Sequence, residues 1–239
     1  MLYSETDLGF GGTSSTQSVS CEFGHFHVNT KRGQVLHIPP GGKGMQEISS
    51  LIGGKPSGLR NWFKEHLPFK ILRENIQGVE NLDTDNAYNG VGITMGYDSR
   101  FRRVFITKKD YILKPLEAGK NIEFINNDFY LTEEGEDNIK ISLNNSTYFE
   151  ECSWTIAYSP IEQRWIGWYS YTPNYYIAHN NYFQTGKNTD DDTFGLWSHL
   201  LTNRSYQVFY GQKYPFVVEF VNKKEYGNTL LTSVDWLGD

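Results

Sequence analysis

Apolar and polar residues alternate along several short segments of this chain, a pattern that predicts β-strands. In Ser153–Tyr176 the large residues Trp154, Ile156 and Tyr158 alternate with small or polar ones, as in a strand with one buried face. Pro160 follows where the chain must reverse, because proline presets the backbone for a bend. The segment therefore predicts a β-hairpin.

The returning strand of this hairpin, Arg164–Tyr169, is apolar at nearly every position. Strands that are bulky on both faces are typical of sheet interiors, so we expect this strand to lie inside its sheet and not at an edge. The whole hairpin segment holds three tryptophans and five tyrosines. We interpret them as packing residues of a scaffold and not as a ligand platform, because similar hairpins recur in the chain.

Three ungapped windows share the plan of this hairpin: His27–Ile38, Gly96–Thr107 and Ala157–Trp168. Each turn opens with a residue type that hydrogen-bonds its own backbone. These residues are Asn29, Asp98 and Ser159. The windows are unequally spaced, which favours one structural unit with variable loops over a strict repeat array. A looser fourth copy is expected within residues 205–221, with its turn at Gly211–Tyr214.

These hairpin units define the organisation that we expect. Their ranges are 20–38, 90–111, 152–176 and 205–221. They belong to a single β-rich domain, 1–239, or to a fragment of a longer protein. The polar stretch 1–19 predicts an N-terminal arm. Residues 45–72 predict a helical insertion, with an amphipathic helix over Ser57–Leu67 that begins at Ser57 as its N-cap.

The pattern between these units is weaker. Short strands are expected over 122–126, 128–132 and 139–143. Residues 180–193 are polar and predict a loop, and 196–203 fits either a brief helix or a strand. The fold class that follows is mainly β: repeated antiparallel hairpin and sheet units, β-propeller-like, with one small helical insertion.

Composition supports a sheet protein and sets limits on function. Aromatic residues make up 15 % of the chain, and aromatic side chains favour strands. No apolar run reaches the ~20 residues that a membrane span needs, and the N-terminus lacks the features of a signal peptide. We therefore expect synthesis in a cytoplasm and no membrane partner. The net charge of −6 argues against general nucleic-acid binding, which depends on Lys and Arg.

Metal sites are only weakly indicated. The acidic clusters Glu133–Asp137 and Asp190–Asp192 do not match an EF-hand, so we interpret them as solvated loop tips, with calcium binding as the alternative. His25 and His27 share a strand face, and His37 joins them in one of the two hairpin registers. Three imidazoles on one face would suit zinc, but ordinary strand histidines are the preferred interpretation. We expect no metal and no cofactor.

Catalytic motifs are absent from the sequence. There is no G-x-S-x-G, H-E-x-x-H or C-x-x-C, and Gly53–Ser57 lacks the full phosphate-loop frame, so it predicts a turn. A carboxylate pair for glycoside hydrolysis stays open, because the sequence does not give the separation of the two groups. Cys21 and Cys152 are expected to be free, mostly buried thiols. We expect the protein not to be an enzyme.

Four segments carry a resemblance to a known family. They are Tyr97–Tyr111, Ser153–Tyr176, Leu196–His199 and Tyr214–Phe220. Their sequence resembles the tail muzzle proteins, or stabilisation proteins, of crAss-like bacteriophages, which are related to the nozzle and hub proteins of short-tailed phages. The resemblance covers most of Gly90–Asp239 and is less distinct in Met1–Asn89. Family members are much longer than this chain, which favours a fragment or a single domain.

The resemblance implies a structural virion protein, made in the host bacterial cytoplasm and located in the phage tail. Such proteins form a ring that surrounds and closes the DNA ejection channel. The implied partners are copies of the protein itself, other tail proteins, and genomic DNA that passes without specific binding; an acidic channel would repel it. The interface loops that we single out are 45–67 and 180–192. The interface candidates are Trp62, Phe63, Tyr175 and Tyr176.

A second class of function is carried as an alternative. It is a carbohydrate-binding or carbohydrate-cleaving β-propeller domain that uses surface aromatics to stack on sugar rings. The best platform for it would be Tyr171, Tyr175 and Tyr176 around Pro173. Trp154, Trp165 and Trp168 lie in strand patterns, and core packing is the preferred interpretation of these three.

Overall fold

The fold is that of a computed structural model of the 239-residue chain. It describes residues 15–41, 44–179, 182–188, 194–199, 207–215 and 217. The chain divides into two compact units, Met1–Arg204 and Ser205–Asp239. The described residues form mainly strands, arranged in several antiparallel sheets, together with one α-helix, α1 (Arg60–His66). The expected mainly-β fold class is therefore confirmed.

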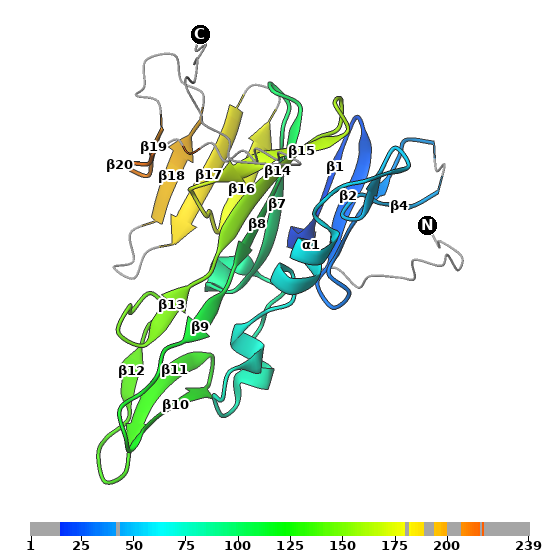
Figure 1. The fold of residues 1–239 in the computed structure, drawn as a ribbon. Helices are drawn as coiled ribbons and strands as arrows, with labels where there is room; N and C mark the ends of the chain where they lie inside the picture. The colour runs from blue at the N-terminus through cyan, green and yellow to red at the C-terminus, as the bar shows by residue number, and fades with distance from the viewer. Residues whose placement is uncertain are drawn as a thin grey trace, which may run out of the picture. The chain divides into compact units, whose positions relative to one another are not determined.

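A four-stranded antiparallel sheet, here called the central sheet, organises the first unit (Figure 1). Its strands in spatial order are β15 (Arg164–Tyr169), β14 (Trp154–Ser159), β8 (Arg103–Lys109) and β7 (Gly92–Asp98). The second and third predicted hairpins lie side by side in it, because β8 pairs with β14 along its length. Their two turns are consequently at the same end of the sheet.

The three predicted hairpins have the same register next to their turns. The first is formed by β2 (Gly24–Asn29) and β3 (Gln34–Ile38). Equivalent positions of the three windows pair across each hairpin. The pairs are Val28 with Val35, Tyr97 with Val104, and Tyr158 with Trp165. The prediction of a common hairpin unit is confirmed at the level of strand pairing.

The three turns also share their backbone conformation. In each turn, the side chain of the opening residue accepts a hydrogen bond from a backbone N–H two or three residues further on. The accepting residues are the predicted Asn29, Asp98 and Ser159. The last turn residue adopts the left-handed conformation in all three cases. These residues are Gly33, Arg102 and Gln163, with φ of 65°, 54° and 50°.

The first hairpin belongs to a separate sheet and has the opposite orientation. This N-terminal sheet has the order β1 (Ser18–Cys21), β2, β3, β4 (Gln46–Glu47). Glu22, between β1 and β2, accepts a hydrogen bond of 2.7 Å from the hydroxyl of Tyr97, at the turn end of the central sheet. Gly33, in the β2–β3 turn, lies instead against Lys64 of α1.

The main hydrophobic core fills the space between the N-terminal sheet, α1 and the central sheet. Alternate residues of each strand point into it, as the period-2 pattern requires. Fully buried members from these three elements include Phe26, Val28, Val35, Phe63, Ile106 and Ile156. Because these side chains come from segments far apart in the chain, their packing fixes the two sheets against each other.

The helix is shorter than predicted. It spans Arg60–His66 within the expected Ser57–Leu67, and its N-cap position is Leu59, without a side-chain cap. Ser57 accepts a hydrogen bond of 3.2 Å from the backbone N–H of Leu59, and its hydroxyl also donates to the carbonyl of Ser49. The prediction of Ser57 as N-cap was therefore wrong: its side chain holds the loop before the helix instead.

A third sheet packs on the other face of the central sheet (Figure 1). This outer sheet has the order β16 (Tyr175–His179), β17 (Tyr182–Asn188), β18 (Phe194–Ser198). Residues 182–188 were predicted to lie in a polar loop, and that prediction was wrong. Phe183 and Thr185 are buried against the central sheet while polar residues alternate with them, and a strand this polar resembles a loop in sequence.

β15 does not have the interior position predicted for it. It lies at the edge of the central sheet, and the side chain of Trp168 is 55 % exposed. A register shift between Ala157 and Tyr158 leaves Ile166 without a partner on β14, and such a bulge changes the direction of the side chains that follow. The apolar run of β15 thus combines Trp165, which is partly buried against the core, with exposed residues.

A smaller group of strands extends from the end of β8. Its sheet has the order β10 (Lys120–Ile125), β11 (Asp128–Glu133), β12 (Ile139–Ile141), which confirms the three short strands expected in this region. A two-stranded sheet of β9 (Tyr111–Leu113) and β13 (Phe149–Glu151) connects it to the central sheet.

Short elements complete the described part of the chain. They are β5 (Leu51–Ile52), β6 (Lys55–Pro56) and the 3-10 helices η1 (Ser15–Gln17), η2 (Ile71–Arg73), η3 (Val79–Asn81) and η4 (Ala87–Asn89). The second unit holds β19 (Val208–Phe209) and β20 (Gln212–Lys213), which pair across Tyr210 and Gly211. The fourth hairpin therefore has a two-residue turn and not the predicted turn at Gly211–Tyr214, because both turn residues adopt positive φ.

The sheets of the first unit are stacked and not arranged radially. The outer, central and N-terminal sheets follow one another as layers (Figure 1). Within the residues that the structure describes, no closed barrel or propeller is formed. The coarse expectation of repeated antiparallel hairpins is met.

Candidate functional site

Two of the interface candidates, Trp62 and Phe63, are neighbours on α1 with different surroundings. Phe63 is fully buried in the main core, with its ring 4.8 Å from that of Trp165. Trp62 is half-buried and belongs to an aromatic cluster that reaches the surface. Its ring stacks on His66 at 4.6 Å and lies 5.6 Å from the exposed Trp168. Only Trp62 of this pair can therefore contact another molecule.

The other two candidates, Tyr175 and Tyr176, point to opposite faces of the outer sheet. The ring of Tyr175 lies over Gly186 of the neighbouring strand. Tyr176 points inward, where its ring lies against Gly96 of the central sheet, and a Cβ atom on Gly96 would be 2.5 Å from its Cγ. Tyr176 is thus part of the packing between two sheets, and Tyr175 is the one on the outward face.

A chain of hydroxyl groups crosses the layer between these two sheets. Thr155 donates to the carbonyl of Tyr171 at 2.6 Å, so Thr107 must donate to Thr155 at 2.7 Å. The hydroxyl of Tyr176 then donates to Thr107 at 2.6 Å. Every proton in this chain has an acceptor, which is the arrangement that a buried polar network needs to stabilise a fold. We assign it a structural role.

A buried ion pair lies on the core face of the central sheet. Lys108 Nζ is 2.6 Å from Asp110 Oδ2, and the two side chains are 1 % and 0 % exposed. Nζ also donates to the carbonyl oxygens of His66 and Pro68, at 2.8 and 2.9 Å. All three ammonium protons are therefore used. Burial lowers the pKa of Lys108, against the opposing effect of the adjacent Asp110 charge.

The carboxylate of this pair is equally well satisfied. Asp110 accepts hydrogen bonds from the backbone N–H groups of Lys70, Ile71 and Tyr111, at 2.7, 3.2 and 3.0 Å. The pair thus joins the end of α1 and the start of η2 to the central sheet. Sequence reasoning missed it, although charged residues that interrupt the apolar strand pattern of β8 are a usable signal. The hydrogen bonds of this ion pair leave neither Lys108 nor Asp110 available as a proton donor or acceptor in catalysis.

The histidines proposed for zinc do not lie together. The register of β2 with β3 sets His37 opposite Phe26, on the face away from His25 and His27. His37 stacks on Phe26 at 4.2 Å and bonds the carbonyl of Phe23 at 2.8 Å. Within the described ranges no three or more His, Cys, Asp or Glu side chains are grouped to hold a metal ion.

His27 is nevertheless in an unusual position. It is 7 % exposed, and its Nδ1 is buried without a hydrogen-bond partner. Burial lowers the pKa of His27 to about 4, with a further contribution from the nearby His25. The imidazole is therefore neutral at pH 7, and its protonation opposes folding.

The thiols are free, as expected. Cys21 and Cys152 form no disulfide, and both are half-buried. Burial raises the pKa of Cys152 to about 11, with a further contribution from the charge of Asp110. Because the thiolate is the reactive form, this cysteine is a poor nucleophile at neutral pH.

A cavity of about 610 Å³ lies where β8 continues into β9 and the smaller group of strands. Its volume is within the range of small-molecule sites. The lining includes four amide side chains, on Asn89, Asn127, Asn144 and Asn174. The hydroxyl of Tyr111 donates to Asn144 Oδ1 at 3.0 Å. The lining residues come from segments scattered over the chain, so no sequence motif could have revealed this cavity.

Two lysines that line this cavity pair with carboxylates. Lys109 is 2.9 Å from Glu151, and Lys140 is 2.8 Å from Asp128. Burial raises the pKa of Glu151 while the charge of Lys109 lowers it, and the net shift is downward. The cavity therefore offers neutral hydrogen-bonding groups, two ion pairs and the carboxyl group of Asp83.

Comparison with known protein families, curated proteins and solved structures finds no match for this chain. No helix among the described residues is long and apolar enough to cross a membrane. The interface loop expected over 180–192 is β17 in its described central part, and the acidic cluster Asp190–Asp192 lies outside the described residues.

Proposed function

We propose that this chain is a structural protein of a short-tailed bacteriophage tail, part of the ring-shaped muzzle or nozzle that surrounds and closes the DNA ejection channel. The observation that carries the proposal is the position of the two longest phage-like segments, Tyr97–Tyr111 and Ser153–Tyr176. They contribute β8, β14 and β15 of the central sheet, together with the end of β7. The resemblance to muzzle proteins thus falls on the scaffold of the fold.

The packing of this scaffold supports a mechanical role. The central sheet is covered on both faces. A buried ion pair connects it to the segment after α1, and a buried hydroxyl chain connects it to the outer sheet. Fully satisfied polar groups of this kind favour one rigid arrangement. A ring subunit that holds a channel under load requires such rigidity. In this proposal the protein has no catalytic role, and it binds copies of itself and other tail proteins.

Electron microscopy of the purified protein and of virions tests the proposal. Immunogold labelling should place the protein at the far end of a short tail, and negative-stain class averages should show a ring with rotational symmetry. Labelling of purified virions that is no higher than in a mock preparation would exclude the virion location. The propeller-like arrangement that we expected from the sequence stays a prediction.

One observation favours a second candidate function, carbohydrate binding. The platform predicted for it is not available, because Tyr171 is 3 % exposed and Tyr176 packs between two sheets. The amide-lined cavity beside Tyr111 is a better site, since Asn side chains donate and accept hydrogen bonds as sugar hydroxyls require. Glycan-array binding that is lost in Asn144→Ala would support this function. Absence of binding to every glycan would remove it.

A further inference from the structure

Two adjacent lysines at the end of β8 lie on opposite faces of the central sheet, because successive side chains of a strand alternate. Lys108 points into the main core, where its ammonium group uses all three of its protons. Lys109 points to the face that carries the outer sheet, and it lines the cavity of about 610 Å³ beside Tyr111. Its exposed fraction is 3 %. Lys109 is therefore a buried cation at the wall of a cavity.

The hydrogen bonds of Lys109 use only part of its ammonium group. Nζ donates to Glu151 Oε1 at 2.9 Å, and the described part of the chain gives it no second acceptor. Gly92, its cross-strand neighbour on β7, has no side chain that could accept. An ammonium group has three donors, so the protein leaves two N–H groups of this buried cation unused. Because buried donors without a partner cost free energy, a molecule in the cavity that accepts from them gains affinity.

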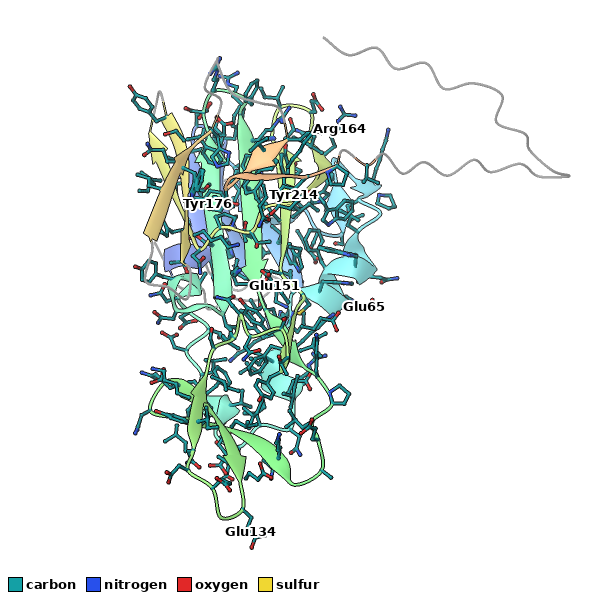
Figure 2. All side chains as sticks on the ribbon, turned by 90° about the vertical axis from the view of Figure 1, so that its left-hand side faces the viewer. Glu65, Glu134, Glu151, Arg164, Tyr176 and Tyr214 are labelled. Carbon is teal, nitrogen blue, oxygen red and sulfur yellow. The ribbon has the colours of Figure 1, made fainter. Side chains whose placement is uncertain are left out.

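Glu151 neutralises Lys109 without filling the cavity. Its carboxylate also accepts a hydrogen bond of 3.2 Å from the hydroxyl of Thr172, and Glu151 is not among the residues that line the cavity. Figure 2 shows it where the central sheet gives way to the smaller group of strands. The carboxylate is thus held on one side of the ammonium group, and the cavity lies on another side.

The rest of the lining combines aromatic walls with amide groups. Tyr111, Phe124 and Phe129 are buried and form part of the inner wall. Asn89 and Asn127 are exposed lining residues, and each amide can both donate and accept. A sugar ring has the matching chemistry, because its C–H face is apolar and each hydroxyl on its edge donates and accepts. Apolar walls with a few polar groups that fix orientation are typical of small-molecule sites.

The charges around this cavity favour a neutral ligand over an anion. Lys109 is paired with Glu151, and Lys140, which also lines the cavity, is paired with Asp128. Asp83 adds a further carboxylate to the lining. Two lysines thus stand against three carboxylates, so an acidic ligand would meet a site that is negative on balance. The donors of Lys109 are therefore best matched by the oxygen atoms of an uncharged molecule.

We propose that the cavity binds a neutral sugar unit and that Lys109 donates its two remaining N–H groups to hydroxyl oxygens of that sugar. The amide side chains of the lining bond further hydroxyl groups, and the aromatic wall contacts the C–H face. This inference rests on the second candidate function, carbohydrate binding. It adds the residue that recognises the sugar and the charge class of the sugar, and it does not depend on the ring proposal.

Titration of the full chain with single sugars tests the inference. The neutral probes are the methyl glycosides of glucose, galactose and mannose, the acidic probe is glucuronate, and saturation-transfer NMR gives the dissociation constants. The wild type should bind at least one neutral probe more tightly than glucuronate. Lys109→Met should weaken that binding at least about tenfold, because hydrogen bonds from a charged donor are lost. Lys64→Met, at an exposed lysine of α1 outside the lining, is the matched control and should bind like the wild type.

A second variant keeps Lys109 and changes the charge around it, so it tests the inference even where Lys109→Met does not fold. Asp83→Asn/Glu151→Gln removes two negative charges, and the preference should shift at least about tenfold towards glucuronate. Near-ultraviolet circular dichroism checks the fold of each variant.

The outcomes separate the inference from the function on which it rests. If a neutral glycoside binds the wild type and a folded Lys109→Met equally well, Lys109 does not recognise the sugar, while carbohydrate binding stands. Tighter binding of glucuronate than of every neutral probe by the wild type, or an unchanged preference in the double variant, would also overturn the inference. If no sugar binds the wild type, the second candidate function is lost together with it.

Discussion

Single residues show how closely the sheets of this protein fit. The outer sheet approaches the central sheet where Tyr176 lies against Gly96, and it is held there by the hydroxyl chain through Thr107. On the opposite face, Lys108 and Asp110 fix the segment that follows α1. In both places a small or charged residue in a strand pattern is explained by a partner from another element.

Gly96→Ala should destabilise the protein by about 1–3 kcal/mol, a typical cost of overpacking. The added Cβ would lie 2.5 Å from Tyr176 Cγ, so the outer sheet or the ring must shift. The measurement is the urea midpoint of unfolding. Gly167→Ala is the matched control, because a Cβ there meets no atom within 4 Å. Equal midpoints for the two variants would show that the sheets are not packed as described.

His27 should make the protein less stable below neutral pH. Its pKa is about 4 in the folded chain, below the ordinary value, so the unfolded chain binds the proton first as pH falls. The contribution of His27 to the free energy of unfolding is highest above about pH 6.5. It falls between pH 6.5 and pH 4, by up to roughly 1.4 kcal/mol per pH unit. Urea unfolding at pH 7.0 and 5.0 measures the loss, which should shrink in His27→Leu. An unchanged difference in that variant would contradict the assignment.

At the scale of elements, the three hairpins have turns with the same backbone conformation but different residues. The last turn position adopts the left-handed conformation in each hairpin, but only the first hairpin has glycine there. Gly33 is required for space as well as for conformation, since a Cβ would lie 2.6 Å from the Cα of Lys64. Gln163, at the equivalent position of the third hairpin, lies in an exposed turn and carries only the conformational strain of a non-glycine residue.

Exchanging these two residue types should therefore have opposite effects. Gly33→Gln should destabilise the protein by more than about 2 kcal/mol, because backbone atoms of α1 must move. Gln163→Gly should be neutral or stabilising by up to about 1 kcal/mol, since the relief of strain outweighs the added freedom of the unfolded chain. Thermal unfolding of both variants measures the difference. If Gln163→Gly lost as much stability as Gly33→Gln, the last positions of the two turns would not have the equivalent conformation described above.

At the scale of the whole molecule, the described core belongs to the first unit alone. The buried core residues extend from Phe26 to Tyr158, and the outer sheet that covers the central sheet ends before residue 200. The first unit has the sheet pairings and buried contacts that an independently folding domain requires.

A chain truncated after Arg204 should therefore still fold cooperatively. Its melting temperature should stay within a few degrees of that of the full chain, and its near-ultraviolet circular dichroism should keep the aromatic signals of the core. The full-length chain serves as the reference in the same buffer. Loss of a cooperative transition would mean that residues 205–239 complete the fold of the first unit.

The sequence by itself determined the local structure of this protein. Period-2 alternation and turn residues located three hairpins and their turns, because turn conformation and strand alternation depend on neighbouring residues. The same reasoning placed β15 inside a sheet and residues 182–188 in a loop. It failed there because strand order and burial depend on which other strands are nearby.

Only the tertiary structure decided which residues are available for function. Phe63 and Tyr176 were interface candidates in the sequence and are packing residues in the fold, whereas Trp168 is exposed. The histidine pattern left the face of His37 undecided until the strand register was known. Phe23 and Pro160 line one groove although they are far apart in the chain, and neighbours over that separation arise from long-range packing. Local patterns therefore specify the strands, and the packing of sheets against one another creates the surfaces.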